Sequence, residues 1–213
     1  MAEIIFIKIV TVPQSAAFQD LSDSMKGYWQ HKCSALNLNS AEEEYLLRAG
    51  IYAEFGKITA VALGVLRNGE LRTKILTNEN EGELLNELID LLEEKFASKP
   101  ICFCGYNLKE FDLPFLSRRF LANQIDLPLL LLNLPKYKPW QYPHVDLLNK
   151  WKFGDRKGFT PLGLICEILG IEYNHEVAKV ILMKESPFND MSSINNYCQN
   201  EIEAISKLHE FYS

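Results

Sequence analysis

Ile4-Ile5-Phe6-Ile7-Lys8-Ile9-Val10-Thr11-Val12-Pro13 is the stretch that decides the fold of this chain. It is apolar on both faces, which predicts a strand buried on two sides in the middle of a sheet. One charged residue, Lys8, interrupts it. A buried lysine requires an anionic partner or must lose its charge. The stretch therefore predicts a central strand whose lysine is paired with an acid from elsewhere in the chain.

The composition suits one sizeable α/β domain over residues 1–213, because 47% of the 213 residues are hydrophobic. No apolar run approaches the roughly 20 residues that cross a bilayer, and no cationic leader is evident, so we expect a cytoplasmic protein with no membrane partner. The net charge of −6 is unevenly spread, with +4 on residues 109–157 and −5 on each flank. A basic middle suits a phosphate backbone, and an ordinary mixed surface explains it equally well.

The hydrophobic patterns predict a mixed five-stranded sheet flanked by helices. Strands are expected at 57–67 and 70–76, joined by an Asn68-Gly69 hairpin turn, and at 101–105. A further strand is expected at 127–132, with a connection at Val145. One helix is expected to begin after the N-cap Ser40. Further helices are expected at 81–96, 113–123, 161–169 and 192–212.

The last of these helices carries an acid within its apolar stripe. The residues that recur at spacings of three and four are Ile194, Tyr197, Cys198, Glu201, Ile205 and Leu208. An acid on a buried face requires a cation or a hydrogen-bond donor. Two interpretations stay open: Glu201 faces the core, or it lies at the edge of the stripe and reaches solvent. Tyr197 suits a core aromatic as well as a catalytic group.

A second acid, Asp112, stands where the helix at 113–123 begins, after a buried strand that stops at Gly105. Asp112 suits a helix N-cap, and Pro114 in the first turn agrees with that interpretation. Asn107 suits a turn residue.

Taken together, Asn107-x-x-x-Phe111-Asp112 and Tyr197-x-x-x-Glu201 resemble the second and third motifs of the DEDD family of 3′–5′ exonucleases, in its tyrosine subgroup. The likeness covers nearly the whole chain and is greatest to bacterial exonucleases related to the proofreading domain of family-B DNA polymerases. Residues 11–14, 49–58, 111–119 and 151–155 also carry it. The resemblance implies a ribonuclease H-like fold and single-stranded DNA 3′ ends as the substrate class.

The resemblance also implies two divalent metals, Mg²⁺ or Mn²⁺, held roughly 4 Å apart by four carboxylates around the scissile phosphate. In this chain Asp112 matches one of those metal ligands, and Glu201 stands where the family has an aspartate that serves as another. Tyr197 matches the residue that orients the attacking water. The residues that match or adjoin the substrate-binding positions are Thr11, Asn107, Phe111, Arg118 and Arg119.

The first motif departs from the family pattern. Where the family has an Asp-x-Glu pair, this chain has Lys8 and Val10, which point to the same strand face. Two carboxylates and one ammonium leave almost nothing to hold a second dication. We therefore expect Lys8 to take the place of a metal and pair with Asp112 and Glu201, with hydrolysis lost or strongly reduced. Two alternatives stay open: an active exonuclease with an altered ligand set, and a protein-interaction scaffold that no longer binds DNA.

Overall fold

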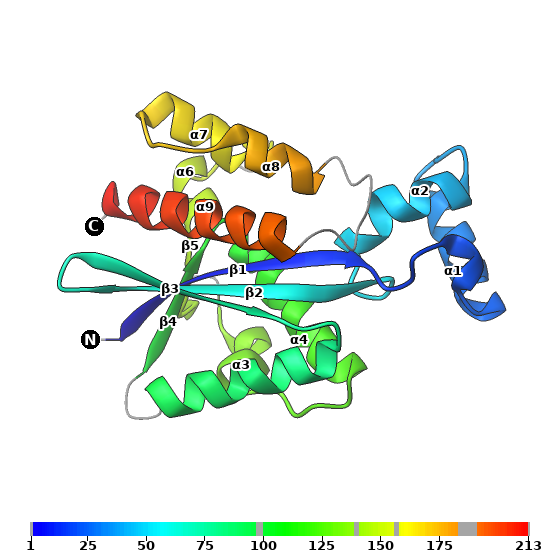
Figure 1. The fold of residues 1–213 in the computed structure, drawn as a ribbon, viewed down its shortest axis with the longest axis horizontal. Coiled ribbons are helices and arrows are strands. Elements are labelled where there is room, and N and C mark those ends of the chain that lie inside the picture. The colour runs from blue at the N-terminus through cyan, green and yellow to red at the C-terminus, as the bar shows by residue number, and fades with distance from the viewer. Residues whose placement is uncertain (1, 97–99, 139–140, 156–157, 183–190, 213) are drawn as a thin grey trace.

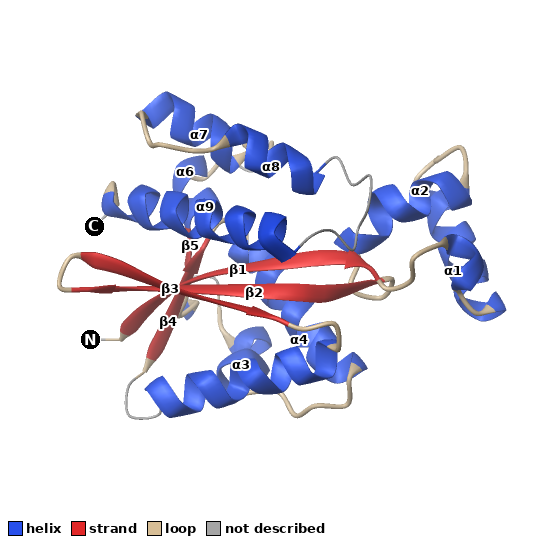
Figure 2. Cartoon of the chain, viewed as in Figure 1, coloured by secondary structure: helices blue, strands red, loops and turns tan. Residues whose placement is uncertain are grey.

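The computed structural model describes residues 2–96, 100–138, 141–155, 158–182 and 191–212. Within these ranges, five strands form one sheet in the order β3-β2-β1-β4-β5 (Figure 1, Figure 2). The strands are β1 (Glu3–Pro13), β2 (Gly56–Arg67), β3 (Glu70–Thr77), β4 (Ile101–Gly105) and β5 (Val145–Asp146). The pairs β1–β2 and β2–β3 are antiparallel, whereas β1–β4 and β4–β5 are parallel. The predicted central strand, hairpin and mixed five-stranded sheet are confirmed.

Helices cover both faces of the sheet (Figure 1). One face carries α3 and α4, and the other carries α9 with α6, α7 and α8. The bounds are α3 (Glu81–Phe96), α4 (Leu113–Ala122), α6 (Leu147–Lys152), α7 (Leu162–Leu169), α8 (His175–Leu182) and α9 (Met191–Glu210). In the part of the chain that the structure describes, no helix combines the length and hydrophobicity that a bilayer crossing requires.

Successive side chains of β1 point to opposite faces of the sheet and so contribute to the core on both sides. Ile5, Ile7 and Ile9 pack toward α3 and α4, whereas Phe6 and Val10 pack toward α9. Each such side chain stabilises the fold by about 1.5–3 kcal/mol when it is fully buried. Since Lys8 belongs to the second row, its side chain enters the layer between β1 and α9.

A smaller core lies beyond the end of β1, at the end of the molecule formed by α1 (Asp23–Ala35) and α2 (Ala41–Arg48) (Figure 1). Trp29 is fully buried there and donates its indole N–H to the Ala41 carbonyl at 2.7 Å. The Ser40 hydroxyl accepts a hydrogen bond from the Glu43 amide at 3.3 Å, which confirms Ser40 as the N-cap of α2. The sequence predicted irregular to helical structure over residues 14–50 and gave α1 no bounds of its own, because only Trp29 and Cys33 of that helix are buried.

The predicted strand at 127–132 is wrong. The chain forms a short helix, α5 (Leu129–Leu132), in which the Pro128 carbonyl accepts from the Leu131 and Leu132 amides at 2.8 and 3.0 Å. A short apolar run is compatible with a strand or a helix, so periodicity does not separate the two. The fifth strand is β5 instead.

A buried ion pair joins α3, α4 and β2. The Arg119 guanidinium donates to the Glu81 carboxylate, with Nη2–Oε2 at 2.6 Å, and to the Ala53 carbonyl at 2.8 Å. The same carboxylate accepts from the Ile58 amide of β2 at 2.6 Å and from the Asn123 side chain at 2.8 Å. Charge and hydrogen bonds are thus satisfied together, which a buried pair requires.

Arg119→Met should lower the free energy of unfolding by about 3–5 kcal/mol, because it leaves the Glu81 carboxylate buried without its cation. The neighbouring Arg118→Met is the matched control, since Arg118 pairs with Glu54 at 3.1 Å in an exposed position. That control should cost about 0–1 kcal/mol. Denaturant unfolding measures both values, and equal losses would contradict a structural role for Arg119.

Candidate functional site

A cavity of about 360 Å³ lies over the second half of β1, between the segment that follows β4 and the α7–α9 side of the sheet. It brings together many of the residues that the sequence singled out: Lys8, Val10, Thr11, Asn107, Phe111, Tyr197 and Glu201. Phe159 and Ile51 add apolar surface to its wall and are 62% and 49% exposed. The residues come from β1, from the turn before α4 and from α9, so the fold assembles the cavity from distant parts of the sequence.

Lys8 is paired with Asp112 at the floor of this site. The Lys8 ammonium lies 3.2 Å from Oδ1 and 3.5 Å from Oδ2 of Asp112. The Ile9 amide also donates to Oδ1, at 3.0 Å. The side chain of Asp112 is 1% exposed and that of Lys8 is 14% exposed, and only Lys8 of the two lines the cavity. The predicted ion pair between Lys8 and Asp112 is therefore present.

A single π-helical turn, Leu108–Asp112, places Asp112 under β1. The turn begins at Asn107, whose backbone is left-handed with φ of 57°. The backbone of Asp112 is helical and its side chain makes no capping hydrogen bond, so the N-cap interpretation does not hold. The carboxylate crosses to β1 instead.

Asp146, at the end of β5, holds this π turn in place through a hydrogen bond to its backbone. Its buried carboxylate accepts from the Lys109 amide at 2.8 Å and from the Leu148 amide at 3.0 Å. Burial raises the pKa of Asp146, although these backbone N–H groups act to lower it. No role was predicted for Asp146, and its contribution lies in positioning the π turn.

Glu201 is 5% exposed, so it faces the core and does not reach solvent from the edge of α9. The hydroxyl of Tyr173, a residue that the sequence did not single out, donates to Oε1 of Glu201 at 2.5 Å. A second hydrogen bond, with the Tyr197 side chain, also acts to lower the pKa of Glu201. Tyr173 follows α7 in a segment without regular structure. No hydrophobic period marks such a segment, which explains why sequence reasoning missed it.

The electrostatics of the site follow from burial opposed by charge. Burial acts to lower the pKa of Lys8, but the Asp112 and Glu201 carboxylates outweigh it and leave that pKa raised. Burial raises the pKa of Asp112 and of Glu201, while the ammonium acts to lower both. Burial and the Glu201 charge also raise the pKa of the Tyr197 phenol. Lys8 thus remains cationic at neutral pH.

The expected pairing of Lys8 with Glu201 is met only in part. Asp112 makes the ion pair within 4 Å, whereas Glu201 acts on Lys8 through its charge across a longer distance. Among the described residues, no three Asp, Glu, His or Cys side chains gather closely enough to hold a metal ion. The described residues therefore do not supply the set of carboxylates that a two-metal site requires.

The two arginines expected at the substrate lie outside the cavity. Arg119 is engaged with Glu81 in the layer on the α3 and α4 side of the sheet. Arg118 is exposed and pairs with Glu54. The geometry assigns Arg119 a structural contact, and it leaves Arg118 on the surface.

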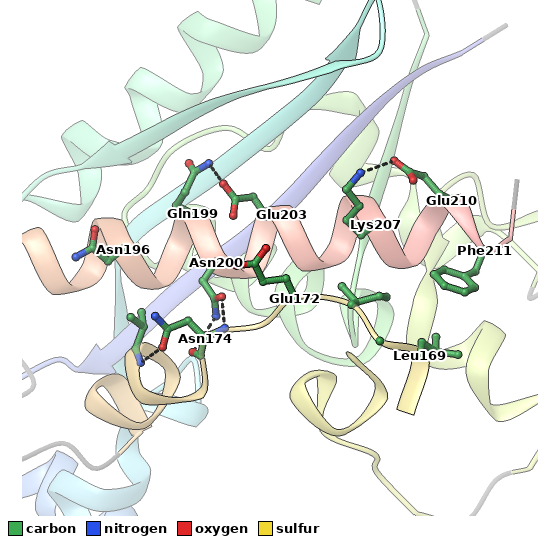
Figure 3. Close-up of a pocket in the computed structure, with 13 residues that line it drawn as sticks. Leu169, Glu172, Asn174, Asn196, Gln199, Asn200, Glu203, Lys207, Glu210 and Phe211 are labelled. Carbon is green, nitrogen blue, oxygen red and sulfur yellow. Dashed lines mark hydrogen bonds and ion pairs between the residues drawn. The ribbon is translucent and has the colours of Figure 1, made fainter. Parts of the chain in front are cut away.

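A larger cavity, of about 770 Å³, lies on the outer side of α9, where the segment from Leu169 to Asn174 runs beside the helix (Figure 3). Its labelled residues are mostly amides and acids, including Glu172, Glu203 and Glu210. None of the residues predicted for the metal or the substrate lines it. The smaller cavity over β1 is therefore the candidate site.

Lys8→Met should cost about 3–5 kcal/mol of unfolding free energy at pH 8, because Asp112 is then buried without a cation. In the variant, the folded pKa of Asp112 lies above its unfolded value near 4, so the folded state binds that proton more tightly. Its stability is therefore greatest at low pH and falls as the pH rises through the folded pKa. The native Lys8 contribution behaves differently, being complete below about pH 10.5 and lost only above it.

Denaturant unfolding at pH 5 and pH 8 measures this difference, which should be larger at pH 8. The double variant Lys8→Met with Asp112→Asn is the control, because both charges are gone and the amide oxygen still accepts from Ile9. It should recover most of the loss. A Lys8→Met variant as stable as the native chain at both pH values would contradict the proposed ion pair.

Comparison with known proteins gives one family match. A family model described as RNase_H superfamily matches residues 48–179, which include Asn107, Phe111 and Asp112 but neither β1 nor α9. No curated protein matches the chain. The family match and the mixed sheet flanked by helices agree on a ribonuclease H-like fold. Because the match covers more than half of its residues, this chain belongs to the RNase_H superfamily.

Proposed function

We propose that this chain binds the 3′ end of single-stranded DNA in the cavity over β1, with hydrolysis lost or strongly reduced. The observation that carries the proposal is the Lys8–Asp112 ion pair at the floor of that cavity. In the exonucleases that the chain resembles, a carboxylate from the first strand and the acid equivalent to Asp112 hold catalytic metals. Here the first-strand residue is a cation, and the acid neutralises it.

An ammonium does not replace the chemistry of a metal pair. Two metals activate a water and stabilise the leaving oxygen at the same time. Lys8 is held cationic by its neighbours, so it has no free electron pair with which to act as a base. The loss of hydrolysis follows from this charge arrangement, and the loss of binding does not.

The walls of the cavity support binding. Phe111, Tyr106 and Phe159 offer aromatic surface on which an unstacked base can pack. The Asn107 side chain adds an amide that both donates and accepts hydrogen bonds. A net charge of +4 on residues 109–157 favours approach of a phosphate backbone to this part of the chain.

Fluorescence anisotropy with a labelled single-stranded oligonucleotide tests the binding. We expect a dissociation constant that rises with salt concentration and does not change when EDTA replaces Mg²⁺. Phe111→Ala should weaken binding about tenfold through lost stacking. Phe211→Ala is the matched control, because Phe211 is exposed at the larger cavity on α9 and should leave binding unchanged. No binding at low salt would favour the scaffold alternative.

Digestion of an oligonucleotide in Mn²⁺ tests the chemistry, with the label at its 5′ end so that 3′ trimming produces a ladder. The native chain should release product no faster than Asp112→Asn, because neither holds a metal pair. The Asp112→Asn control also reports contaminating nuclease. Rapid trimming by the native chain that Asp112→Asn abolishes would contradict the proposal and favour an exonuclease with an altered ligand set.

A further inference from the structure

Both acids that the chain shares with the metal-dependent family pattern are engaged by its own side chains. Asp112 is neutralised by Lys8, and Glu201 accepts a hydrogen bond from Tyr173 at 2.5 Å. The second contact is independent of the first, since Tyr173 lies between α7 and α8 and Lys8 lies on β1. Tyr173, Lys8 and Glu201 all line the same cavity.

The segment that carries Tyr173 is anchored to α9 next to Glu201. The Asn174 amide donates to the Asn200 side chain at 2.8 Å, and the Asn200 side chain donates back to the Asn174 carbonyl at 3.3 Å (Figure 3). Two neighbouring sets of hydrogen bonds therefore join this segment to α9: Tyr173 to Glu201, and Asn174 to Asn200. Such an anchored partner holds its hydrogen bond at little further cost in conformational entropy.

Gly163 leaves the space in which the Tyr173 ring packs. A Cβ atom placed on Gly163 would lie 2.8 Å from Cε1 of Tyr173, closer than packed carbon atoms approach. Gly163 is buried in the first turn of α7, and its backbone does not require glycine, because its φ is not positive. The absence of a side chain at 163 is therefore what admits the ring against α7.

We propose that Tyr173 is a positioning residue that keeps the Glu201 carboxylate engaged, so that two independent contacts, Lys8–Asp112 and Tyr173–Glu201, close this site to divalent cations. The inference deepens the proposed function, since it concerns the same cavity. It makes a specific claim: restoring the two missing acids at positions 8 and 10 removes only one of the two contacts. Efficient metal binding then also requires Tyr173 to release Glu201.

Isothermal titration with Mn²⁺, supported by the electron paramagnetic resonance signal of the free ion, tests the claim without measuring activity. The base variant is Lys8→Asp with Val10→Glu. Adding Tyr173→Phe to it should tighten Mn²⁺ binding at least about tenfold, because the Glu201 carboxylate no longer has to give up a charge-assisted hydrogen bond in order to turn toward the ion. Adding Gly163→Ala should act in the same direction, because it displaces the ring while keeping the phenol.

Adding Tyr142→Phe is the matched control, because Tyr142 is a partly buried tyrosine packed against the core on the α3 and α4 side. It should leave Mn²⁺ binding unchanged. Circular dichroism and cooperative unfolding establish that each variant folds, and the two routes to releasing Glu201 keep the test decisive if one variant does not. Equal Mn²⁺ affinity in the base variant and in a folded Tyr173→Phe or Gly163→Ala derivative overturns the proposal.

The outcome is separable from that of the proposed function. Oligonucleotide binding is measured on the native chain in EDTA, whereas Mn²⁺ binding is measured on the restored variants without DNA. A native chain that binds no oligonucleotide would refute the first proposal while the Mn²⁺ result stands on its own.

Discussion

The candidate site depends on the contact between the Lys8 ammonium and the Asp112 carboxylate. β1 is the middle strand of the sheet and is packed on both faces, so a charge on it must be compensated from within the protein. Asp112 supplies that compensation from a segment 104 positions further along the chain. The π turn that holds Asp112 is fixed in turn by Asp146 at the end of β5. The cavity over β1 depends on this arrangement.

The proposed binding and the proposed loss of hydrolysis rest on different features of the same cavity. The cavity keeps aromatic and amide side chains from three parts of the fold, and these suit an unstacked nucleotide. Both acids of the site are engaged within the protein, Asp112 by the Lys8 ammonium and Glu201 by the Tyr173 hydroxyl. Membership of the RNase_H superfamily agrees with the mixed five-stranded sheet flanked by helices. It does not by itself assign hydrolysis, because the activity of a fold resides in the side chains at its site.

The central strand and the two buried acids could be predicted from the sequence, because in each case a charged residue conflicts with its apolar surroundings. A lysine in a strand that is apolar on both faces demands an acid, and an acid in a helical stripe demands a donor. Those two conflicts led to Asp112 and Glu201. The Tyr173 contact and the π turn lie in segments with no period, so neither could be inferred from a pattern. The error at 127–132 has the same origin, since a run of leucines fits a strand and a helix alike.

The hydrogen bond from the Ile9 amide to Asp112 has a consequence for how an acid at such a site is interpreted. The ladder between β1 and β4 ends at the pair Phe6 and Cys104, so the strand beyond it lacks a neighbour on that side, and an aspartate fills the gap. Asp112 is therefore part of the scaffold, and its removal would leave the Ile9 amide without its hydrogen-bond acceptor. This structural contribution is independent of any reaction at the site. The presence of such an acid in a sequence is thus evidence of the architecture and not by itself evidence of turnover.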